Sequence, residues 1–250
     1  MFTLVCNGKT YNRVWFTSDE HYSSERHIQL SRRSAFINFD SKTKKESYDI
    51  ARMDATFIKN NNDLVGENDI VFHLGDFGNR KIVRHLKGDH MLILGNYEKS
   101  EIRHMVDLGI FDYNDAYRYF REICKKHGFV DVYTNCVFDD TNHISDVFGS
   151  EIAKEIEKIF LIHEPENCIY TKENGVYSAK YRVVDKNISD EEQKKYYTMN
   201  IFGHIHEKGK CKRFGVNVGV DCNHYMPVSS EDVAFYLNAI LHHYDENVFM

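Results

Sequence analysis

The sequence lacks the features that mark several large classes of protein. No apolar run approaches the roughly 20 residues of a membrane-spanning helix, so we expect no membrane partner. No apolar signal-peptide segment opens the chain, which favours a cytoplasmic protein in a reducing compartment. Lys and Arg number 32 against 38 Asp and Glu, and this net charge of −6 provides no general basic field for nucleic acid. A local basic patch stays open as an alternative.

The six cysteines form no C-x-x-C pair, which disfavours a thiolate zinc site or a redox pair. The sequence also lacks internal repeats, low-complexity tracts and clear linkers. A chain of 250 residues with 42% hydrophobic residues is long enough for one substantial core. The 14 histidines are numerous for this length and need an explanation.

The first hundred residues alternate between strand and helix patterns. Short apolar segments predict strands, and spacing of three to four predicts helices. The expected strands are 2–6, 11–17, 69–74 and 91–94, with a turn at Asn7-Gly8-Lys9, and the expected helices are 48–64 and 81–86. This alternation is typical of a layered α/β fold.

The remaining residues continue the mixed pattern with less regularity. We expect helices at 115–127, 150–158 and 230–242, and strands at 130–138, 159–162, 198–202 and 211–220. Residues 166–195 are polar, and we interpret them as an exposed insertion.

Polar side chains that bind metals follow five of the expected strands. They are Asp19-Glu20-His21, Gly75-Asp76, Gly95-Asn96, His163 and Gly203-His204-Ile205-His206. Ligands bind at the carboxyl ends of strands in layered α/β folds, because the loops there point into one crevice. Side chains two residues apart in an extended segment share a face, so Asp19 with His21 and His204 with His206 can each present two ligands.

Each of these short patterns alone is typical of a turn or a surface loop, and Gly-His-x-His is the most suggestive of them. Together and in this order they indicate a metal site. Carboxylate oxygens combined with imidazole nitrogens suit Mn, Fe, Zn or Ni, whereas Ca and Mg sites are richer in oxygen.

The five segments read SDEH, LGDF, LGNYE, IHEP and FGHIH. In this order they resemble the motifs of the calcineurin-like metallophosphoesterase superfamily. The segments SERHIQLSRRSAF, LKGDHMLILGN and FGVNVGVDCNHYMPVS are similar to small bacterial and phage members of that family.

The resemblance implies a layered α/β fold, a two-sheet β-sandwich flanked by helices, with a two-metal site at one edge. The resemblance covers the framework of most of the chain, and we expect a single domain over residues 1–250 with insertions at about 110–158 and 166–197. Asp19, His21 and His206 would hold one metal; Asn96, His163 and His204 would hold the second; and Asp76 would bridge both. We expect two divalent cations, with Mn favoured and Fe, Zn or Ni as alternatives. Such a pair binds phosphate oxygens and lowers the pKa of a bridging water, so that hydroxide can attack.

Two positions depart from the family pattern. Tyr97 stands where the family has a histidine directly after the asparagine, and tyrosine is a poorer general acid at neutral pH. Tyr97 could donate a hydrogen bond without proton transfer, another group such as His224 or a water could be the acid, or the leaving group could need little protonation. Ser24 stands where related small members tend to have a histidine, which would alter substrate binding.

Three further residues are candidates for binding the substrate. Arg32 and Arg33 could contact a substrate phosphate, although a solvated helix face is an alternative for both. His224 could line the crevice, with a surface position as its alternative. His73 is expected in the core or beside a ligand, and the following are expected at the surface: His27, His85, His90, His104, His127, His143, His242 and His243.

We therefore expect a dinuclear metallophosphoesterase in which Asp76, Asn96 and Tyr97 take part in catalysis. A phosphodiesterase acting on nucleotide-like or other small phosphodiesters is favoured, because Tyr97 replaces the family's acid. A phosphomonoesterase or a nuclease is the alternative among enzymes. A non-catalytic metal-binding scaffold is the alternative of another class, although degenerate members of the family typically lose ligands and this chain keeps them.

Overall fold

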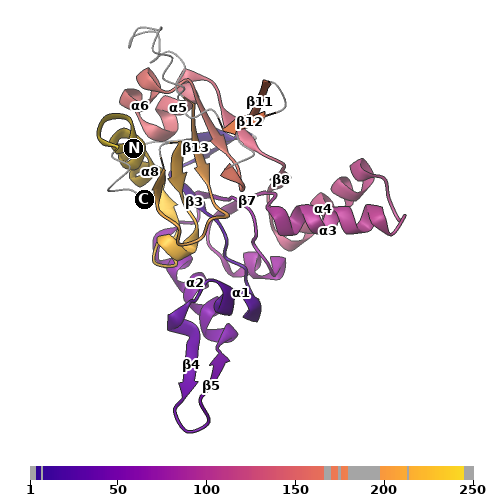
Figure 1. Ribbon diagram of the computed structural model, residues 1–250. Helices are drawn as coiled ribbons and strands as arrows, with labels where there is room; N and C mark the ends of the chain where they lie inside the picture. The colour runs from indigo at the N-terminus through magenta and orange to yellow at the C-terminus, as the bar shows by residue number, and fades with distance from the viewer. Residues whose placement is uncertain are drawn as a thin grey trace.

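The computed structural model describes residues 4–6, 8–165, 170–173, 176–179, 198–212 and 214–244. These residues form two five-stranded sheets, three two-stranded hairpins and several helices (Figure 1). The protein is therefore of the mixed α/β class, as the alternation of strand and helix patterns predicts.

The first sheet has the strand order β16–β3–β6–β7–β8. Its strands are β16 (Val228–Ser229), β3 (Val14–Thr17), β6 (Ile70–His73), β7 (Asp89–Ile93) and β8 (Asp131–Tyr133). All are parallel except β16. Thr17 pairs with His73, and His73 pairs with Leu92, so β3, β6 and β7 end at the same edge.

The second sheet has the strand order β14–β15–β13–β10–β9. Its strands are β14 (Cys211–Lys212), β15 (Gly215–Asn217), β13 (Thr198–Phe202), β10 (Lys158–Leu161) and β9 (Cys136–Phe138). The three central strands β15, β13 and β10 are parallel, and both edge strands are antiparallel to them. Leu161 pairs with Ile201, which brings the ends of β10 and β13 together.

The largest apolar cluster combines side chains from both sheets. Phe16 and Phe72 of the first sheet stack with ring centroids 5.8 Å apart, and Phe72 meets Phe138 of the second sheet at 6.4 Å. Three helices complete this cluster: α5 (Thr141–Phe148), α6 (Ser150–Glu155) and α8 (Ser230–His243). Because one core joins the two sheets, loops that leave either sheet are held at fixed positions relative to the other.

A second cluster covers the other face of the first sheet. Leu92 and Leu94 point into it, since side chains alternate between the two faces of a strand. The helices on this side are α2 (Ile50–Leu64), α3 (Asn96–Asp107) and α4 (Tyr113–His127). Asp49 caps α2 by accepting a hydrogen bond from the Arg52 N–H, and Gly128, at a φ of 120°, ends α4.

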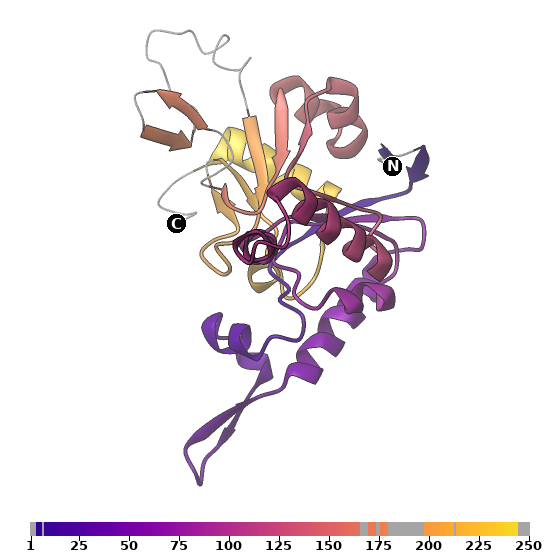
Figure 2. The ribbon, with the colours of Figure 1, turned by 90° about the vertical axis from the view of Figure 1, so that its right-hand side faces the viewer.

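Three hairpins and one short helix complete the described chain. They are β1 (Leu4–Cys6) with β2 (Lys9–Tyr11), β4 (Ile37–Asp40) with β5 (Lys45–Tyr48), β11 (Tyr170–Glu173) with β12 (Val176–Ala179), and α1 (Glu25–Leu30). The β4–β5 hairpin projects from the body of the protein beyond α1 and α2 in both ribbon views (Figures 1 and 2).

Several expected elements differ from those observed. The predicted strand 11–17 is divided, because β2 pairs with β1 whereas β3 joins the first sheet. The predicted helix 81–86 is a 3₁₀ helix, Arg80–His85. The predicted strand 130–138 breaks at Thr134 and Asn135 into β8 and β9, which lie in different sheets.

The expected insertions have different outcomes. Residues 110–158 supply an edge strand to each sheet and helices to both apolar clusters, so they are part of the core and not an appendage. Of residues 166–197, the structure describes the β11–β12 hairpin, and the other residues of that insertion lie outside the described part of the chain. Among the helices that the structure describes, none has the length and apolar composition to cross a membrane.

Candidate metal centre

The seven predicted metal ligands gather where the two sheets meet. Asp19, Asp76 and Asn96 follow β3, β6 and β7 of the first sheet, whereas His163 and His204 follow β10 and β13 of the second. Backbone hydrogen bonds link these loops, including Asp19 N–H to Gly75 O at 3.1 Å and Gly203 N–H to His163 O at 3.1 Å. The site is therefore built from both sheets.

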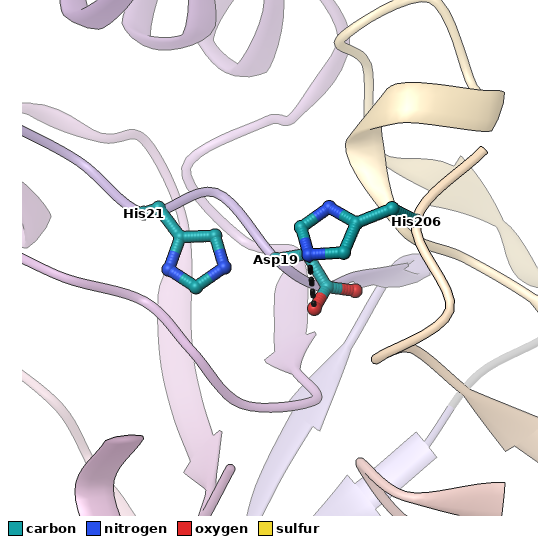
Figure 3. Close-up of side chains that lie close together, drawn as sticks. All are labelled: Asp19, His21 and His206. Atoms are coloured by element: carbon teal, nitrogen blue, oxygen red, sulfur yellow. Dashed lines mark ion pairs between the residues drawn. The ribbon is translucent and has the colours of Figure 1, made fainter. Parts of the chain in front are cut away.

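One group of side chains suited to a metal comprises Asp19, His21 and His206, whose ligand atoms all lie within 4.8 Å of one another. Figure 3 shows the three side chains close together, with a dashed line from the His206 imidazole to the Asp19 carboxylate and the His21 imidazole beside them. Nε2 of His206 lies 3.9 Å from Oδ1 of Asp19. This group contains the residues expected to hold the first metal.

A second group comprises Asp19, Asp76 and His163, again within 4.8 Å of one another. Oδ2 of Asp76 lies 3.3 Å from Nε2 of His163 and 3.7 Å from Nε2 of His21. Asp76 therefore belongs to the second group and also lies close to His21 of the first group. Asp19 is the residue common to both groups, although the resemblance assigns it to one metal.

Asn96 and His204 lie beside the second group. Oδ1 of Asn96 is 2.9 Å from Nε2 of His163 and 3.2 Å from Nδ1 of His204. The backbone N–H of His204 donates to Oδ2 of Asp19 at 2.8 Å. All seven predicted ligands are therefore connected in one cluster.

Two atoms of this cluster are buried without a hydrogen-bond partner among the described residues: Oδ1 of Asp19 and Nε2 of His21. A buried polar atom without a partner costs about 1–3 kcal/mol, so such atoms are uncommon unless a ligand or an ion completes them. Both atoms belong to the first metal group. The residues present therefore fit a bound divalent cation.

The charges of the cluster favour a cation. Burial raises the pKa of Asp19, since it disfavours a carboxylate in a low-dielectric site. Burial alone would lower the pKa of His163, but its hydrogen bond to Asp76 and the charge of Asp19 raise that pKa to about 9. The pKa of Asp76 is lowered despite its burial, because His163 bonds to it. Without a metal, a proton on His163 balances the carboxylates.

Neighbouring groups orient two of the imidazoles. Nδ1 of His163 lies 2.7 Å from the Leu74 carbonyl oxygen, which can only accept, so this nitrogen carries hydrogen and Nε2 faces the carboxylates. Nδ1 of His206 lies 2.6 Å from Oδ2 of Asp221, which leaves its Nε2 directed at Asp19. Such partners fix the tautomer and the orientation of metal-binding histidines.

Glu98 joins the loops after β6 and β7. One of its carboxylate oxygens accepts from the N–H groups of Asp76 and Gly95, each at 2.9 Å, and the other accepts from Phe77 at 3.0 Å. Burial and the nearby Asp76 raise the pKa of Glu98 to about 7. Neither Glu98 nor Asp221 was among the predicted site residues. The E of LGNYE is a signal for Glu98, and Asp221 is the D of the segment FGVNVGVDCNHYMPVS.

The backbone of the site is held in unusual conformations. Five of the seven ligands have φ in the left-handed region: Asp19, His21, Asp76, His204 and His206, at 60°, 49°, 56°, 70° and 49°. Non-glycine residues rarely adopt this region, and where they do they cluster at functional sites. Gly203 is required by close packing, because a Cβ there would lie 1.9 Å from Oγ of Ser18 and 2.5 Å from Oδ2 of Asp19.

The prediction that Arg33 contacts substrate is wrong, and so is its alternative of a solvated helix face. The side chain is buried, and Nε and Nη2 form an ion pair with Asp221 at 2.8 and 3.1 Å. Its remaining donors bond to the carbonyl oxygens of Glu20 and Asp19 and to Met53. All five guanidinium N–H groups are therefore used within the fold.

Arg32 and His224 do not line the cleft beside the cluster, and their exposure agrees with the surface alternative and not with a substrate contact. The Arg32 side chain is 72% exposed and lies 3.9 Å from Glu46 of the β4–β5 hairpin. His224 is exposed on the turn that precedes β16. Neither residue lines the cleft above the metal groups.

That cleft has a volume of about 280 Å³. Five of the seven ligands line it, and we call them its floor: His21, Asp76, Asn96, His204 and His206. The other lining residues, which include Leu30, Tyr97, Ile205, Glu207 and Lys208, form its walls. Tyr97 lines the cleft as expected, but in the first turn of α3 and not in a turn between elements. Its backbone N–H donates to Oδ1 of Asp76 at 3.0 Å.

Two histidines expected at the surface are buried. His27 lies in the wall of the cleft, stacked on His21 with ring centroids 3.4 Å apart. His90 lies in β7 beside His73. The expected core position of His73 is confirmed, since it is 1% exposed. A local sequence pattern does not show which histidines turn inward.

No family model matches the chain, and no curated protein matches it either. Among solved structures, the chain is similar to the crystal structure of a protein of unknown function from Aquifex aeolicus. The two share 18% sequence identity with a TM-score of 0.45, over 87% of this chain and 95% of the other.

Proposed function

We propose that the protein is a metal-dependent phosphohydrolase of the calcineurin-like metallophosphoesterase type, with the two-sheet sandwich of that family. The observation that carries this proposal is the pair of overlapping ligand groups. They share Asp19, Asp76 of the second group lies 3.7 Å from His21 of the first, and the first group includes buried ligand atoms without hydrogen-bond partners among the described residues. A cleft that a substrate could enter adjoins these ligands, as a catalytic site requires.

In this proposal Asp19, His21 and His206 hold one divalent cation, and Asn96, His163 and His204 hold the other, with Asp76 shared. Mn is favoured by the mixture of carboxylate, amide and imidazole ligands. Two such cations would polarise a phosphoryl group and make a water acidic enough to attack it at neutral pH.

The chain itself supplies position and electrostatics, on which most phosphoryl-transfer catalysis depends. Glu98 fixes the Asp76 and Asn96 loops, and Asp221 fixes His206. Asp19, Asp76 and His163 are almost fully buried, so charges at the cleft floor are weakly screened. Lys208 in the wall of the cleft offers a phosphate group a positive charge, beside the acidic Glu207.

The cleft walls favour a phosphodiester with a flat or apolar ester group. Leu30, Ile205 and Tyr97 line the cleft beside its polar ligands. Leu30 is 58% exposed, so its apolar side chain is accessible to a bound ligand. Apolar side chains around a few fixed polar groups are typical of sites for small ligands. The small volume and the acidic net charge suit a nucleotide-like substrate better than a duplex.

Metal content and hydrolysis test this proposal together. We expect two Mn per chain after reconstitution, and faster hydrolysis of a 4-nitrophenyl phosphodiester of thymidine than of 4-nitrophenyl phosphate. Asp76→Ala and His204→Ala should reduce the rate more than about 100-fold, since both remove groups at the reacting centre.

The matched control is His85→Ala, an exposed histidine of the 3₁₀ helix, which should keep the parental rate. Absence of bound Mn, Fe, Zn or Ni together with absence of hydrolysis would refute the proposal. Near-parental rates in both site variants would show that the site is elsewhere.

A further inference from the structure

Ser24, His27 and Tyr97 form a hydrogen-bonded chain in the wall of the cleft. Oγ of Ser24 is 2.7 Å from Nδ1 of His27, and Nε2 of His27 is 3.0 Å from the Tyr97 hydroxyl oxygen. Ser24 and Tyr97 are also the two positions that depart from the family pattern in the sequence. His27 joins them. Ser24 and His27 lie at the start of α1, whereas Tyr97 lies in the first turn of α3.

The surroundings fix this chain in place. The His27 ring lies parallel to His21, with centroids 3.4 Å apart and an interplanar angle of 1°. The Tyr97 ring meets His21 edge-on at 5.2 Å. The backbone N–H of Tyr97 donates to Oδ1 of Asp76, and its hydroxyl is bonded to His27, so both ends of the residue are fixed beside the first metal group.

The direction of the hydrogen bonds decides what Tyr97 can do. A phenol has one hydrogen, so a Tyr97 hydroxyl that donates to His27 has none left for the cleft. In the described chain, Nδ1 of His27 is the acceptor within reach of the Ser24 hydroxyl hydrogen. If Ser24 donates there, Nε2 of His27 carries the ring hydrogen and donates it to the Tyr97 oxygen. A doubly protonated His27 would also donate to Tyr97.

We propose that Ser24 and His27 are positioning residues that leave the Tyr97 hydroxyl hydrogen free to donate to the leaving ester oxygen of the substrate. This inference rests on the proposed phosphohydrolase function and extends it to residues outside the metal ligands. Tyr97 then contributes a hydrogen bond to developing charge and does not need to transfer its proton. As the bond between phosphorus and this oxygen breaks, a poor leaving group needs the hydrogen bond most, so the contribution should depend on the leaving group.

Leaving-group dependence tests the chain. With Mn bound, Tyr97→Phe and His27→Leu should each slow cleavage of a thymidine dinucleotide by roughly 10- to 100-fold, the effect of losing a hydrogen bond to a charged group. Both should slow the 4-nitrophenyl diester by less than about threefold, since its leaving group needs little stabilisation. The double variant should be no slower than Tyr97→Phe, because the two residues act through one hydroxyl.

Conservative variants separate positioning from packing. His27→Gln places an amide N–H near the position of Nε2 and should recover most of the loss seen in His27→Leu. Ser24→Ala should slow dinucleotide cleavage by a few-fold, because it frees the His27 tautomer. Bound Mn should stay at the parental level in all of these variants.

A spectroscopic measurement decides the direction without any turnover. In metal-free protein labelled with ¹⁵N-histidine, the His27 signals, assigned by their loss in His27→Gln, should show hydrogen on Nε2. Hydrogen on Nδ1 alone would overturn the inference, as would additive losses in the double variant or a His27→Leu rate equal to the parental rate. These results leave the proposed function standing, whereas a parental chain without metal and without hydrolysis refutes that function itself.

Discussion

Two clusters of carboxylates and histidines draw on three consecutive residues of the chain. Asp19 and His21 belong to the candidate metal groups, whereas the buried Glu20 between them belongs to a second cluster. There, Oε1 of Glu20 is 2.5 Å from Nδ1 of His73, and Nε2 of His73 is 2.8 Å from Nδ1 of His90. We call these three residues the inner histidine chain.

The two clusters share their residue types but not their geometry. Each cluster contains two buried atoms without a hydrogen-bond partner among the described residues: Oε2 of Glu20 and Nε2 of His90 in the inner histidine chain, and Oδ1 of Asp19 and Nε2 of His21 in the other. The difference is that the ligand atoms of Asp19, His21 and His206 all lie within 4.8 Å of one another, whereas the inner histidine chain is a line of hydrogen bonds. Burial, composition and unpaired atoms alone therefore do not define a candidate metal site, whereas convergence of several ligand atoms does.

The largest expected difference between the clusters is in Mn binding and hydrolysis, when the neighbouring carboxylates Asp19 and Glu20 are each changed to the amide. Asp19→Asn removes a carboxylate common to both metal groups and should reduce Mn binding and hydrolysis by more than about 100-fold. Glu20→Gln should keep two Mn per chain. Metal analysis after dialysis and steady-state rates measure both variants, and equal losses in the two would abolish the distinction between the clusters.

A smaller effect on Mn binding is expected from a change at Asp221, the carboxylate that accepts a hydrogen bond from His206. Asp221→Asn should weaken Mn binding by roughly 10- to 100-fold, because Asp221 fixes the tautomer of His206 and also pairs with Arg33. Titration with Mn gives the affinity. The matched control is Asp69→Asn, a buried carboxylate that accepts from Trp15 at 3.0 Å and from the Gly66 N–H at 2.9 Å. An equal loss of affinity in the control would assign the effect to stability.

The smallest effect concerns the protonation of the inner histidine chain. Burial raises the pKa of Glu20 to about 8 and lowers that of His73 to about 3, so at neutral pH a neutral acid bonds to a neutral imidazole. A raised carboxyl pKa gives stability that is full below the unfolded value of 4.5 and is lost as pH rises towards 8.

Glu20→Gln should therefore gain stability relative to the parental chain as pH rises from 4.5 to 8, by at most about 1.4 kcal/mol per pH unit. Urea unfolding of metal-free protein across this range measures the difference, with the exposed Glu67→Gln as the control. A relative loss of stability with rising pH would instead indicate an ion pair between Glu20 and His73.

The sequence predicts the ligands better than it predicts their surroundings. Asp76 and His204 directly follow apolar segments, which are buried strands in any layered fold. The end of each segment therefore gives the position of the residue in the fold, and its side chain gives the ligand type. His27 and Arg33 belong to a polar segment in which no periodicity shows the buried face. Their burial depends on contacts with Tyr97 and Asp221, which lie 70 and 188 residues away. Local patterns carry no information on such distant partners.

The same limit explains the misassigned elements. The Gly95-Asn96 pair is a common turn signal, yet Asn96 begins α3 because Glu98 bonds back to the Gly95 N–H. Residues Cys136 to Phe138 continue the apolar pattern of β8, but they form a strand of the second sheet, where they pair with β10. Strand propensity predicts that the segment is a strand, whereas contacts with distant residues determine the sheet to which it belongs.

Each metal group draws ligands from both sheets: Asp19 with His206 in one, and Asp76 with His163 in the other. A cation bound in either group would join the two sheets. Because binding and stability are linked, a change that weakens the packing between the sheets must also weaken cation binding. We therefore expect substitutions at the Phe72–Phe138 contact in the shared core to lower the metal affinity, although neither residue contacts the metal.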